Sequence, residues 1–389
     1  MLVVKKFGGS SVADRERIMN VARRCIEDYE KGNDVVVVLS AMGKTTNGLL
    51  EKAREITETP SKRELDMLLV TGEQVSVALM AMAFQSLGVQ AVSLNAAQVA
   101  MRTTSAYGQA KLKRIDTERI RNELDARKIV VITGFQGINK YDDMTTLGRG
   151  GSDTTAVALA VALHADFCEI YTDVDGVYTA DPRIVPNAKK LSEVSYDEML
   201  EFASLGAKVL HNRSVEMAKR YGVKLVVLSS LTRAEGTIIK EKTSMEKMLV
   251  SGVAADKNTA RISVLGVKDE PGIAFRLFNL LARYRINVDI IIQSVGRDNR
   301  KDISFTVART DLQETMKIIN DHLEMLTADS VSADDTVAKI SIIGAGMTSN
   351  PGVAAKMFEA LSGANINIKM IATSEIRITV LIDEEDASR

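Results

Sequence analysis

The sequence predicts an α/β sandwich with a mostly parallel sheet, followed by two small modules that repeat one another. Over about the first 230 residues, short apolar segments alternate with longer amphipathic ones, which is the pattern of consecutive βαβ units. Segments such as Val35–Leu39 are apolar throughout, as expected for strands of a parallel sheet that is covered on both faces. Beyond residue 240 the sequence repeats itself, which predicts two copies of one supersecondary unit.

The elements of the first region follow in order from this alternation. Apolar segments bounded by turn residues predict strands at Leu2–Phe7, Asp34–Ser40, Ala91–Asn95, Ile129–Gly134, Cys168–Asp173 and Leu225–Ser229. Apolar residues at helical spacing predict helices at Ser11–Lys31, Lys62–Leu87, Asp116–Arg127, Thr154–Ala165 and Val215–Tyr221. Gly236-Thr237 and the charged stretch Lys240–Lys247 then predict a linker.

The repeat preserves the order of several short matches, which argues against chance similarity. Ile262–Gly266 corresponds to Ile340–Gly344, Pro271-Gly272 to Pro351-Gly352, Arg285–Ile290 to Asn365–Met370, and Ile303–Val307 to Ile376–Val380. Each unit predicts a strand, a Pro-Gly loop, a helix, a strand, a turn and a strand. We therefore expect a first domain at 1–240, a linker at 241–260 that includes a strand shared with the second region, and modules at 261–335 and 336–389.

Composition excludes several classes of protein. The 389 residues are enough for two or three domains, and 50 basic against 51 acidic residues give no excess charge for binding nucleic acid. Cys25 and Cys168 are the only cysteines, so no disulfide framework is expected and a cytoplasmic location fits. The three histidines are scattered and predict no metal site. We see no apolar run of the roughly 20 residues that a membrane helix needs.

Two Gly-rich segments stand where a strand is expected to hand over to a helix, at Lys6–Ser11 and Thr146–Asp153. Backbone N–H groups at such a junction lack intrahelical partners and face the positive end of the helix dipole, so they attract anions. Glycines let the main chain approach a phosphate closely. One segment carries a Lys and the other an Arg and an Asp, which predicts a site for a phosphorylated nucleotide and an anionic substrate.

Two common nucleotide motifs are absent. No Gly-x-x-x-x-Gly-Lys-Ser/Thr occurs, which excludes a Walker-type site in its usual form. Gly344-Ala345-Gly346 lacks the third glycine of a dinucleotide fingerprint and lies inside the repeat.

Together the motifs resemble those of the aspartokinase family, in that family's order, and the repeat resembles its pair of ACT domains. The segments that carry the resemblance are Lys6–Ser11, Thr71-Gly72-Glu73, Leu147–Asp153, Thr172–Arg183 and Gly206–His211. The resemblance covers essentially the whole chain and implies an amino-acid-kinase-like sandwich followed by two regulatory ACT modules. In the family a helix follows the strand that corresponds to Ile376–Ile382, whereas this sequence ends at Arg389, so the second module is expected to be shortened.

The resemblance implies transfer of the γ-phosphate of ATP to the β-carboxylate of L-aspartate, an early step towards lysine, threonine and methionine. The nucleophile is already ionised at neutral pH, so the reaction needs no general base. It needs cationic and N–H groups that hold two anions together and stabilise the transferring phosphoryl group. Lys6, with the backbone of Gly8, Gly9 and Ser10, is the predicted phosphate contact. We expect Mg²⁺ to be held mainly through phosphates, without a protein cage.

Five further residues are implied as substrate contacts, and Asp153 as a partner of Lys6. Asp153 is either an N-cap of the helix Thr154–Ala165 or the group that holds Lys6, and the two roles are compatible. The expected aspartate contacts are Ser40, Thr46, Glu73, Arg149 and Ser152. A carboxylate such as Glu73 next to an apolar stretch needs a partner, which the substrate ammonium would supply. Arg149 suits a bidentate clamp on a carboxylate, whereas the hydroxyls could also be helix caps.

The family resemblance also places the nucleotide and the regulators. The expected ATP contacts are Thr172, Asp173, Tyr178, Asp181, Arg183 and Lys208, although Asp and Arg in a loop are usually just solvated. His211 is expected to be structural, and Lys5 to be a solvated lysine at the strand end. Lysine, threonine or both are the expected effectors, with sites around Asp269, Asn287, Gln293, Met347 and Asn367, or else these residues are core and turn positions.

Two other functions stay open. The same catalytic fold could use another acceptor, such as acetylglutamate, glutamate or a nucleoside monophosphate. Alternatively, the chain could be an amino-acid sensor with a decayed kinase domain. Intact Lys6, Glu73, Arg149, Asp153 and Lys208 argue for the aspartokinase. An exposed ACT sheet edge predicts a homodimer or higher oligomer, with a second subunit type possible.

Overall fold

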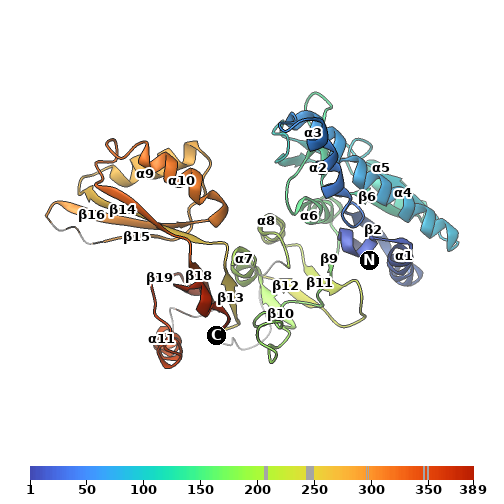
Figure 1. The fold of residues 1–389 in the computed structure, drawn as a ribbon. Coiled ribbons are helices and arrows are strands. Elements are labelled where there is room, and N and C mark those ends of the chain that lie inside the picture. Colours follow the sequence, from blue (N-terminus) through green and yellow to red (C-terminus); the bar gives the residue numbers. More distant parts are fainter. Residues whose placement is uncertain (206–208, 242–248, 295, 297, 345–346, 348–349) are drawn as a thin grey trace. The chain divides into compact units, whose positions relative to one another are not determined.

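The computed structural model of the protein divides into two compact units (Figure 1). It describes residues 1–205, 209–241, 249–294, 296, 298–344, 347 and 350–389. The first unit comprises residues 1–179, 189–204 and 208–245, and the second comprises 180–188, 205–207 and 246–389.

The first unit is built on an eight-stranded sheet among the described residues, with the order β10-β12-β11-β9-β1-β2-β6-β3. Its strands are β1 (Leu2–Phe7), β2 (Asp34–Leu39), β3 (Ala91–Leu94), β6 (Ile129–Thr133), β9 (Phe167–Thr172), β10 (Glu193–Ser195), β11 (Leu225–Ser229) and β12 (Thr237–Lys240). All neighbouring pairs are parallel except β11 and β12. The mostly parallel sheet and the six predicted strands, which are β1, β2, β3, β6, β9 and β11, are therefore confirmed, whereas β10 and β12 were not predicted. The linker prediction at Gly236-Thr237 is wrong, because Thr237 begins β12 and pairs with β11.

The helices of the first unit cover both faces of this sheet. They are α1 (Arg15–Glu30), α2 (Thr45–Ile56), α3 (Lys62–Leu69), α4 (Thr71–Ser86), α5 (Glu118–Asp125), α6 (Gly151–Leu163), α7 (Tyr196–Ser204) and α8 (Asn212–Tyr221). Phe7 of β1 packs with side chains of α1 and α4, such as Val21 and Phe84, in one core cluster. Because side chains alternate along a strand, the neighbouring residue Lys6 faces the opposite side, where α6 lies.

Several helices begin or break elsewhere than predicted, among them α8, which starts at Asn212 rather than Val215. The first long helix starts at Arg15, because Asp14 caps it and Gly9–Val12 forms a 3₁₀ turn. The stretch Lys62–Leu87 is two helices, α3 and α4, that meet at Val70. Helix α6 starts at Gly151 rather than Thr154, because Gly150 adopts a left-handed conformation (φ 65°) and ends the preceding loop.

A smaller sheet, β5-β4-β7-β8, lies beside these helices and was not predicted. Its strands are β4 (Arg102–Thr103), β5 (Leu112–Arg114), β7 (Gln136–Ile138) and β8 (Met144–Thr146). Their two or three residues are too few to show a clear alternating pattern. Strand β8 leads directly into the second Gly-rich segment.

The described residues of the second unit form two four-stranded sheets, one for each predicted module. The first has the order β15-β16-β14-β17, with β14 (Ala260–Lys268), β15 (Ile291–Gln293), β16 (Arg300–Val307) and β17 (Ser330–Asp334). The second has the order β13-β18-β20-β19, with β13 (Gly252–Asp256), β18 (Val337–Ile343), β19 (Met370–Thr373) and β20 (Arg377–Asp383). Helices α9 (Ile273–Arg283), α10 (Leu312–Asn320) and α11 (Val353–Gly363) accompany them.

The second module obtains its fourth strand from a distant part of the sequence. Strand β13 precedes the whole first module, yet it pairs along its length with β18 in the second sheet. It occupies the position that β17 occupies in the first sheet, beside β14. Strand β13 lies in the stretch 241–260, where a strand shared with the second region was expected, and the first module is inserted between β13 and β18.

Both Pro-Gly loops end in a glycine that begins a helix in the left-handed region. Gly272 has φ 92° and Gly352 has φ 94°, a conformation that favours glycine. The two modules have separate cores and share a third apolar cluster, in which Ile290 of the first meets Met370 and Leu381 of the second. The repeat predicted from the sequence is thus a repeat of structure.

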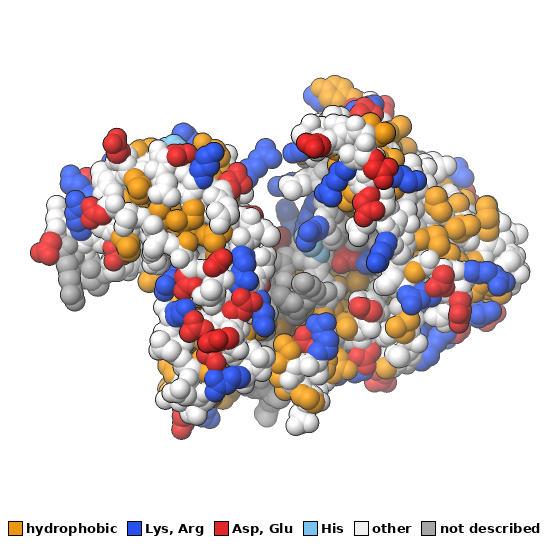
Figure 2. All heavy atoms as spheres, in the orientation of Figure 1, with side chains coloured by type: hydrophobic (Ala, Val, Ile, Leu, Met, Phe, Trp, Pro, Cys, Tyr) orange, Lys and Arg blue, Asp and Glu red, His pale blue; other side chains and the backbone are white. Residues whose placement is uncertain are grey.

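The stretch Lys62–Ser86 is, by length and composition alone, apolar enough to cross a membrane, contrary to the sequence-based expectation. It is mostly a core element, since 56% of its most apolar window is buried. One stripe of α4, at Val75, Leu79 and Met82, is exposed. Orange atoms gather over this part of the first unit, at the right of Figure 2.

Candidate functional site

The carboxyl ends of β1 and β9 form the centre of the candidate site. From β1 the chain continues to neighbouring strands on one side, whereas β9 lies on the other side, so the topology changes direction between them. Open α/β sheets bind ligands outside the carboxyl ends of their strands at such a switch point. Lys6 lies near the end of β1, and Thr172 is the last residue of β9.

Lys6 and Asp153 face each other across this edge. The Lys6 Nζ lies 2.6 Å from the Asp153 Oδ1, and both side chains are only slightly exposed. Asp153 stands in the first turn of α6 and is not its N-cap, so the capping alternative is wrong. Among the described residues, no side chain caps the N-terminus of α6. This helix therefore presents N–H groups and its positive dipole end beside a lysine, which together suit an anion.

The glycines near Lys6 allow two loops to come into backbone contact. A Cβ on Gly9 would lie 2.5 Å from the Ala41 carbonyl oxygen, closer than real side chains come. The Gly43 amide also donates to the Gly9 carbonyl at 2.9 Å. At Gly8 a Cβ would approach the Lys6 Nζ at 3.7 Å. The Lys6–Ser11 segment thus lies against the loop after β2, where Ser40 stands, while Ser10 is exposed.

Three predicted substrate contacts meet at the ends of β2 and α6. The Ser40 Oγ donates to the Ser152 Oγ at 2.9 Å, and the Ala41 amide donates to the Glu73 Oε1 at 3.1 Å. Glu73 is 3% exposed, and its Oε2 has no hydrogen-bond partner among the described residues. Burial raises the pKa of Glu73 to about 7, since its hydrogen bonds offset only part of the desolvation. A buried carboxyl oriented in this way needs a cationic partner.

Arg149 and Thr46 have no such neighbours. Arg149 lies between β8 and α6, is exposed, and makes no hydrogen bond or ion pair with the described part of the chain. Thr46 is half-buried in the first turn of α2. Both are available for a ligand, whereas Ser40, Ser152 and Glu73 already make hydrogen bonds within the protein.

The predicted nucleotide segment is a loop after β9, as expected. The Thr172 Oγ1 donates to Asp173 at 3.0 Å, and the Tyr178 hydroxyl donates to Asp175 at 2.8 Å. Asp181 and Arg183 pair with each other at 2.7 Å on a segment that belongs to the second unit. Lys208 lies outside the described residues.

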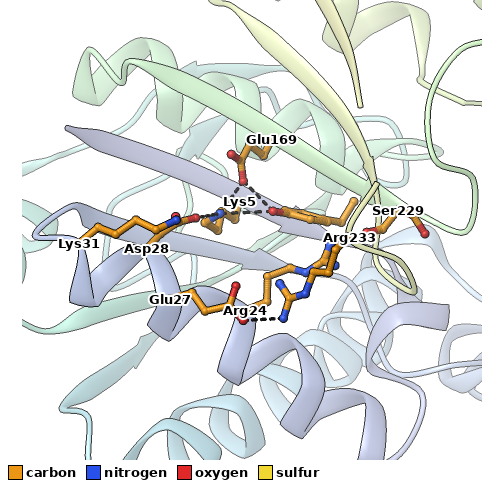
Figure 3. A network of polar contacts seen from close by, with 9 residues as sticks. Lys5, Arg24, Glu27, Asp28, Lys31, Glu169, Ser229 and Arg233 are labelled. Atoms are coloured by element: carbon orange, nitrogen blue, oxygen red, sulfur yellow. Dashed lines mark hydrogen bonds and ion pairs between the residues drawn. The ribbon is translucent and has the colours of Figure 1, made fainter. Parts of the chain in front are cut away.

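Lys5 is fully buried, so the prediction of a solvated lysine is wrong. Its Nζ lies 2.6 Å from Asp28 of α1 and 2.5 Å from Glu169 of β9, and it also donates to the Tyr171 hydroxyl at 3.3 Å. Figure 3 shows Lys5 between these two carboxylates. Burial alone would lower the pKa of Lys5, but the Glu169 carboxylate and its neighbours raise it above its usual value. This ion cluster joins β1, β9 and α1 on the face opposite Lys6.

Sequence reasoning missed two charged residues beside the second Gly-rich segment, Asp66 and Arg213. Asp66 of α3 is 1% exposed and accepts hydrogen bonds from Thr146 and Gly108. Arg213 of α8 donates to the carbonyl oxygens of Leu147 and Ala110. An aspartate on an amphipathic helix and an arginine two residues after His211 gave no signal, because all their partners except the Thr146 hydroxyl are backbone groups.

His211 is structural, as expected. Its Nδ1 accepts a hydrogen bond from the Arg213 amide at 3.4 Å, so it is the N-cap of α8. Its ring also packs against Gly150, where a Cβ would come within 2.3 Å of the ring.

The predicted effector residues differ in how available they are. Asp269 pairs with Lys301 at 2.8 Å. Met347 is buried in the core of the second module, which agrees with the alternative that this residue is a core position. Gln293 ends β15 and is exposed. Asn287 and Asn367 are exposed too, but Asn287 precedes β15 and is not part of a strand.

Family models match three parts of the chain. Residues 1–229 match the amino acid kinase family, and residues 260–324 and 340–389 each match an ACT domain. The first match covers every strand of the eight-stranded sheet except β12, and it covers both Gly-rich segments of the candidate site.

Known proteins resemble the whole chain. An aspartokinase of Bacillus sp. (strain MGA3) is 51% identical over 384 residues, covering 98% of this chain and 93% of its own length. That of Corynebacterium glutamicum is 51% identical over 391 residues, covering 99% and 93%. The crystal structure of E. coli aspartokinase III with aspartate and ADP (R-state) is 29% identical, covers 100% of this chain and 97% of its own, and superposes with a TM-score of 0.85. The crystal structure of the same enzyme with lysine and aspartate (T-state) superposes with a TM-score of 0.79 and again covers 100% of this chain and 97% of its own. The chain therefore belongs to the aspartokinase family and is an ATP-dependent kinase with ACT domains.

Proposed function

We propose that the protein phosphorylates the β-carboxylate of L-aspartate, giving 4-phospho-L-aspartate and ADP. The observation that carries this proposal is the Lys6–Asp153 pair beside the uncapped N-terminus of α6, with Ser40, Ser152 and Glu73 next to it. Such a site can hold a phosphate and an amino acid together. The relatives, which are aspartokinases, support aspartate as the acceptor.

In this reaction a β-carboxylate oxygen attacks the γ-phosphorus, and the bond from that phosphorus to the β,γ-bridging oxygen breaks, so ADP leaves with both electrons. No proton is transferred, which suits a site without a catalytic histidine. Lys6 would neutralise charge on the transferring phosphoryl group, with Asp153 fixing its position. Backbone N–H groups of Gly8, Gly9 and Ser10 would bind the same phosphates.

The substrate is held by groups of both signs in this proposal. Glu73 would receive the α-ammonium, and Arg149 would bind the α-carboxylate through two parallel hydrogen bonds. The hydroxyls of Ser40, Thr46 and Ser152 would complete the contacts. Such a site would select a substrate that carries an ammonium and a carboxylate on the same carbon, as aspartate does. A nucleoside monophosphate has neither of these groups on one carbon, and N-acetylglutamate lacks the ammonium.

The nucleotide would bind along the loop after β9. Thr172, Asp173, Tyr178, Asp181, Arg183 and Lys208 are the proposed contacts. Mg²⁺ would neutralise charge on the β- and γ-phosphates, and phosphate oxygens and water would hold it. The described residues include no set of three or more His, Cys, Asp or Glu side chains arranged to hold a cation, so a protein cage is not part of the proposal.

We propose that lysine, threonine or both inhibit the enzyme through the ACT modules of residues 261–335 and 336–389. The lysine complex of E. coli aspartokinase III supports lysine as an effector. The candidate contacts are Asp269, Asn287, Gln293, Asn367 and, less directly, the buried Met347. The sheets end in strands such as β15 and β19 with one edge unpaired among the described residues, which favours a homodimer or a higher oligomer, or one with a second subunit type. Such an enzyme would supply lysine, threonine and methionine synthesis in the cytoplasm.

A direct test measures ADP release with ATP and Mg²⁺ and, separately, L-aspartate, L-glutamate and N-acetylglutamate. Only aspartate is expected to support turnover, and hydroxylamine should trap its acyl phosphate as a hydroxamate. Lysine and threonine, added singly and together, are expected to inhibit. Turnover with another acceptor would contradict the substrate assignment. No turnover with any acceptor, together with tight amino-acid binding, would indicate the sensor instead.

The pKa of Glu73 predicts how the KM for aspartate depends on pH. In the ligand-free protein this carboxyl is uncharged below about pH 7, and only its ionised form attracts an ammonium group. The KM for aspartate is therefore expected to rise about tenfold for each pH unit below 7, because the competent fraction falls by that factor. The measurement is KM for aspartate and for ATP between about pH 5.5 and 8.5.

Glu73→Gln serves as the control for this pH dependence. It is expected to raise the KM for aspartate at pH 8 and to remove the dependence. The folded-state pKa lies above the ordinary value of 4.5, so the stability that protonated Glu73 contributes to the free protein is lost as the pH rises from about 4.5 to about 7, and the loss is complete above pH 7. The variant should therefore melt at a higher temperature than the parent at pH 8 but not at pH 5. An unchanged KM profile in Glu73→Gln would show that another group titrates.

A further inference from the structure

Two backbone segments meet beside the candidate site, and the same two charged side chains join them. The segments are Tyr107–Ala110 and Thr146–Gly151, and the second of them carries Arg149. They contact each other directly, since the Ala110 amide donates to the Thr146 carbonyl at 2.9 Å and a Cβ on Gly148 would lie 3.1 Å from the Gly108 carbonyl oxygen.

Asp66 joins the two segments through their donors. Its Oδ2 accepts from the Gly108 amide at 2.9 Å and from the Thr146 amide at 3.0 Å, and its Oδ1 accepts from the Thr146 hydroxyl at 2.7 Å. The side chain is buried and has no cationic partner among the described residues. Burial raises the pKa of Asp66, which its three hydrogen bonds partly offset. All hydrogen bonds to this buried carboxylate come from backbone amides and a hydroxyl. An apolar side chain would stabilise the fold as well, which indicates that Asp66 serves to position these groups.

Arg213 joins the same segments through their acceptors. Its Nη1 donates to the Leu147 carbonyl at 3.0 Å, and its Nη2 donates to the Ala110 carbonyl at 2.9 Å. Burial lowers the pKa of Arg213, and no carboxylate among the described residues compensates its charge. The planar fork of a guanidinium spans two carbonyl groups at once, which an ammonium cannot do.

The two side chains thus hold the chain just before Arg149 from opposite sides. Leu147 is fixed further by its amide, which donates to the Phe135 carbonyl at 2.8 Å. On the other side of Arg149, His211 packs against Gly150, which is held at φ 65°. The backbone around Arg149 is therefore fixed, while the guanidinium itself is exposed and unpaired within the described residues.

We propose that Asp66 and Arg213 are positioning residues that set the affinity for the amino-acid substrate by fixing the backbone that carries Arg149. This inference rests on the proposed function, in which Arg149 binds the substrate α-carboxylate. Neither residue touches the substrate. A bidentate clamp works only within a narrow range of position, and a displacement of about 1 Å costs roughly 100-fold in comparable sites.

The test compares Arg213→Lys, Asp66→Asn and Thr146→Val with the parent enzyme. Each weakens or removes at least one bond to the fixed segments. An ammonium does not span both carbonyls, an uncharged amide oxygen is a weaker acceptor than a carboxylate, and valine lacks the hydroxyl. The KM for aspartate is expected to rise about 10- to 100-fold in the first two and about threefold in Thr146→Val, with the KM for ATP within twofold of the parent. Arg102→Lys is the matched control, because Arg102 also donates to a carbonyl, that of Asn139, but is exposed and pairs with Asp142 instead of with either fixed segment.

The same substitutions made in a variant that lacks Arg149 separate an effect on the position of Arg149 from an effect on the stability of the protein. In Arg149→Met, adding Arg213→Lys is expected to change the KM for aspartate by less than twofold, because the group being positioned is gone. Equal effects in both backgrounds, or an unchanged KM in the single variants, would overturn the inference. If Arg149→Met itself leaves this KM unchanged, the role of Arg149 in the proposed function fails, and the inference fails with it. Should Arg213→Lys not fold, the isosteric Thr146→Val in both backgrounds decides the question.

Discussion

Replacing Lys6 by methionine is expected to lower kcat for phosphoryl transfer by about 100- to 1000-fold, the cost of removing one group that stabilises developing charge. Methionine keeps most of the length of the side chain but not its charge. The loss also leaves the Asp153 carboxylate, 2.6 Å from the lost ammonium, facing the phosphates. The KM for aspartate should change little, because Lys6 is assigned to the phosphate. Steady-state kinetics with each substrate varied will measure both quantities.

Asp153 sharpens this prediction. Asp153→Asn alone should lower kcat less than Lys6→Met does, since the lysine stays but loses its anchor. The double variant should be no slower than Lys6→Met, because the repelling carboxylate is gone as well. Lys113→Met removes an exposed lysine from β5 and should leave kcat unchanged. A kcat for Lys6→Met within threefold of the parent would contradict the assignment of Lys6.

Replacing Lys5 by methionine is expected to destabilise the first unit by about 3–5 kcal/mol, because it leaves two carboxylates without their shared cation. Asp28 and Glu169 are each about four-fifths buried, so water replaces the ammonium poorly. The pKa of Lys5 is raised, so the lysine stays charged throughout the range in which the protein is studied. Chemical denaturation at neutral pH, followed by circular dichroism, measures the difference.

An exposed pair provides the comparison for Lys5. Arg102 lies 2.6 Å from Asp142, at a distance like those around Lys5, but both side chains are largely exposed. Arg102→Met is therefore expected to cost less than about 1 kcal/mol. Equal effects of the two substitutions would mean that burial does not determine the contribution of the Lys5 cluster. A triple variant with Asp28→Asn and Glu169→Gln should recover part of the lost stability.

Much of the candidate site was visible in the sequence because its residues are consecutive. Gly-rich segments after apolar strands identify their own local structure, and parallel strands bring their carboxyl ends to one edge. The pairing of Lys6 with Asp153 and of Ser40 with Ser152 follows from that arrangement. Whether these pairs serve the proposed chemistry stays a prediction until the variants are measured.

Other features depend on partners that are distant in the sequence. Lys5 and Lys6 look alike in the sequence, but alternation along β1 sends one into an ion cluster under α1 and the other towards α6. Asp66 and Arg213 bind mainly backbone groups, and every residue has these groups, so the sequence does not indicate which ones are the partners. Strand β13 pairs with β18 of the second module although the whole first module lies between them in the sequence.

The sequence by itself determined the α/β class, the order of the strands along the chain, the repeat and the two Gly-rich segments, since periodicity and glycine placement act over a few residues. Only the tertiary structure decided which lysine is buried, where β13 pairs and what holds the backbone around Arg149. These depend on contacts between residues tens to hundreds of positions apart, and their free energy comes from burial and hydrogen bonds that exist only when the sheet and helices have packed.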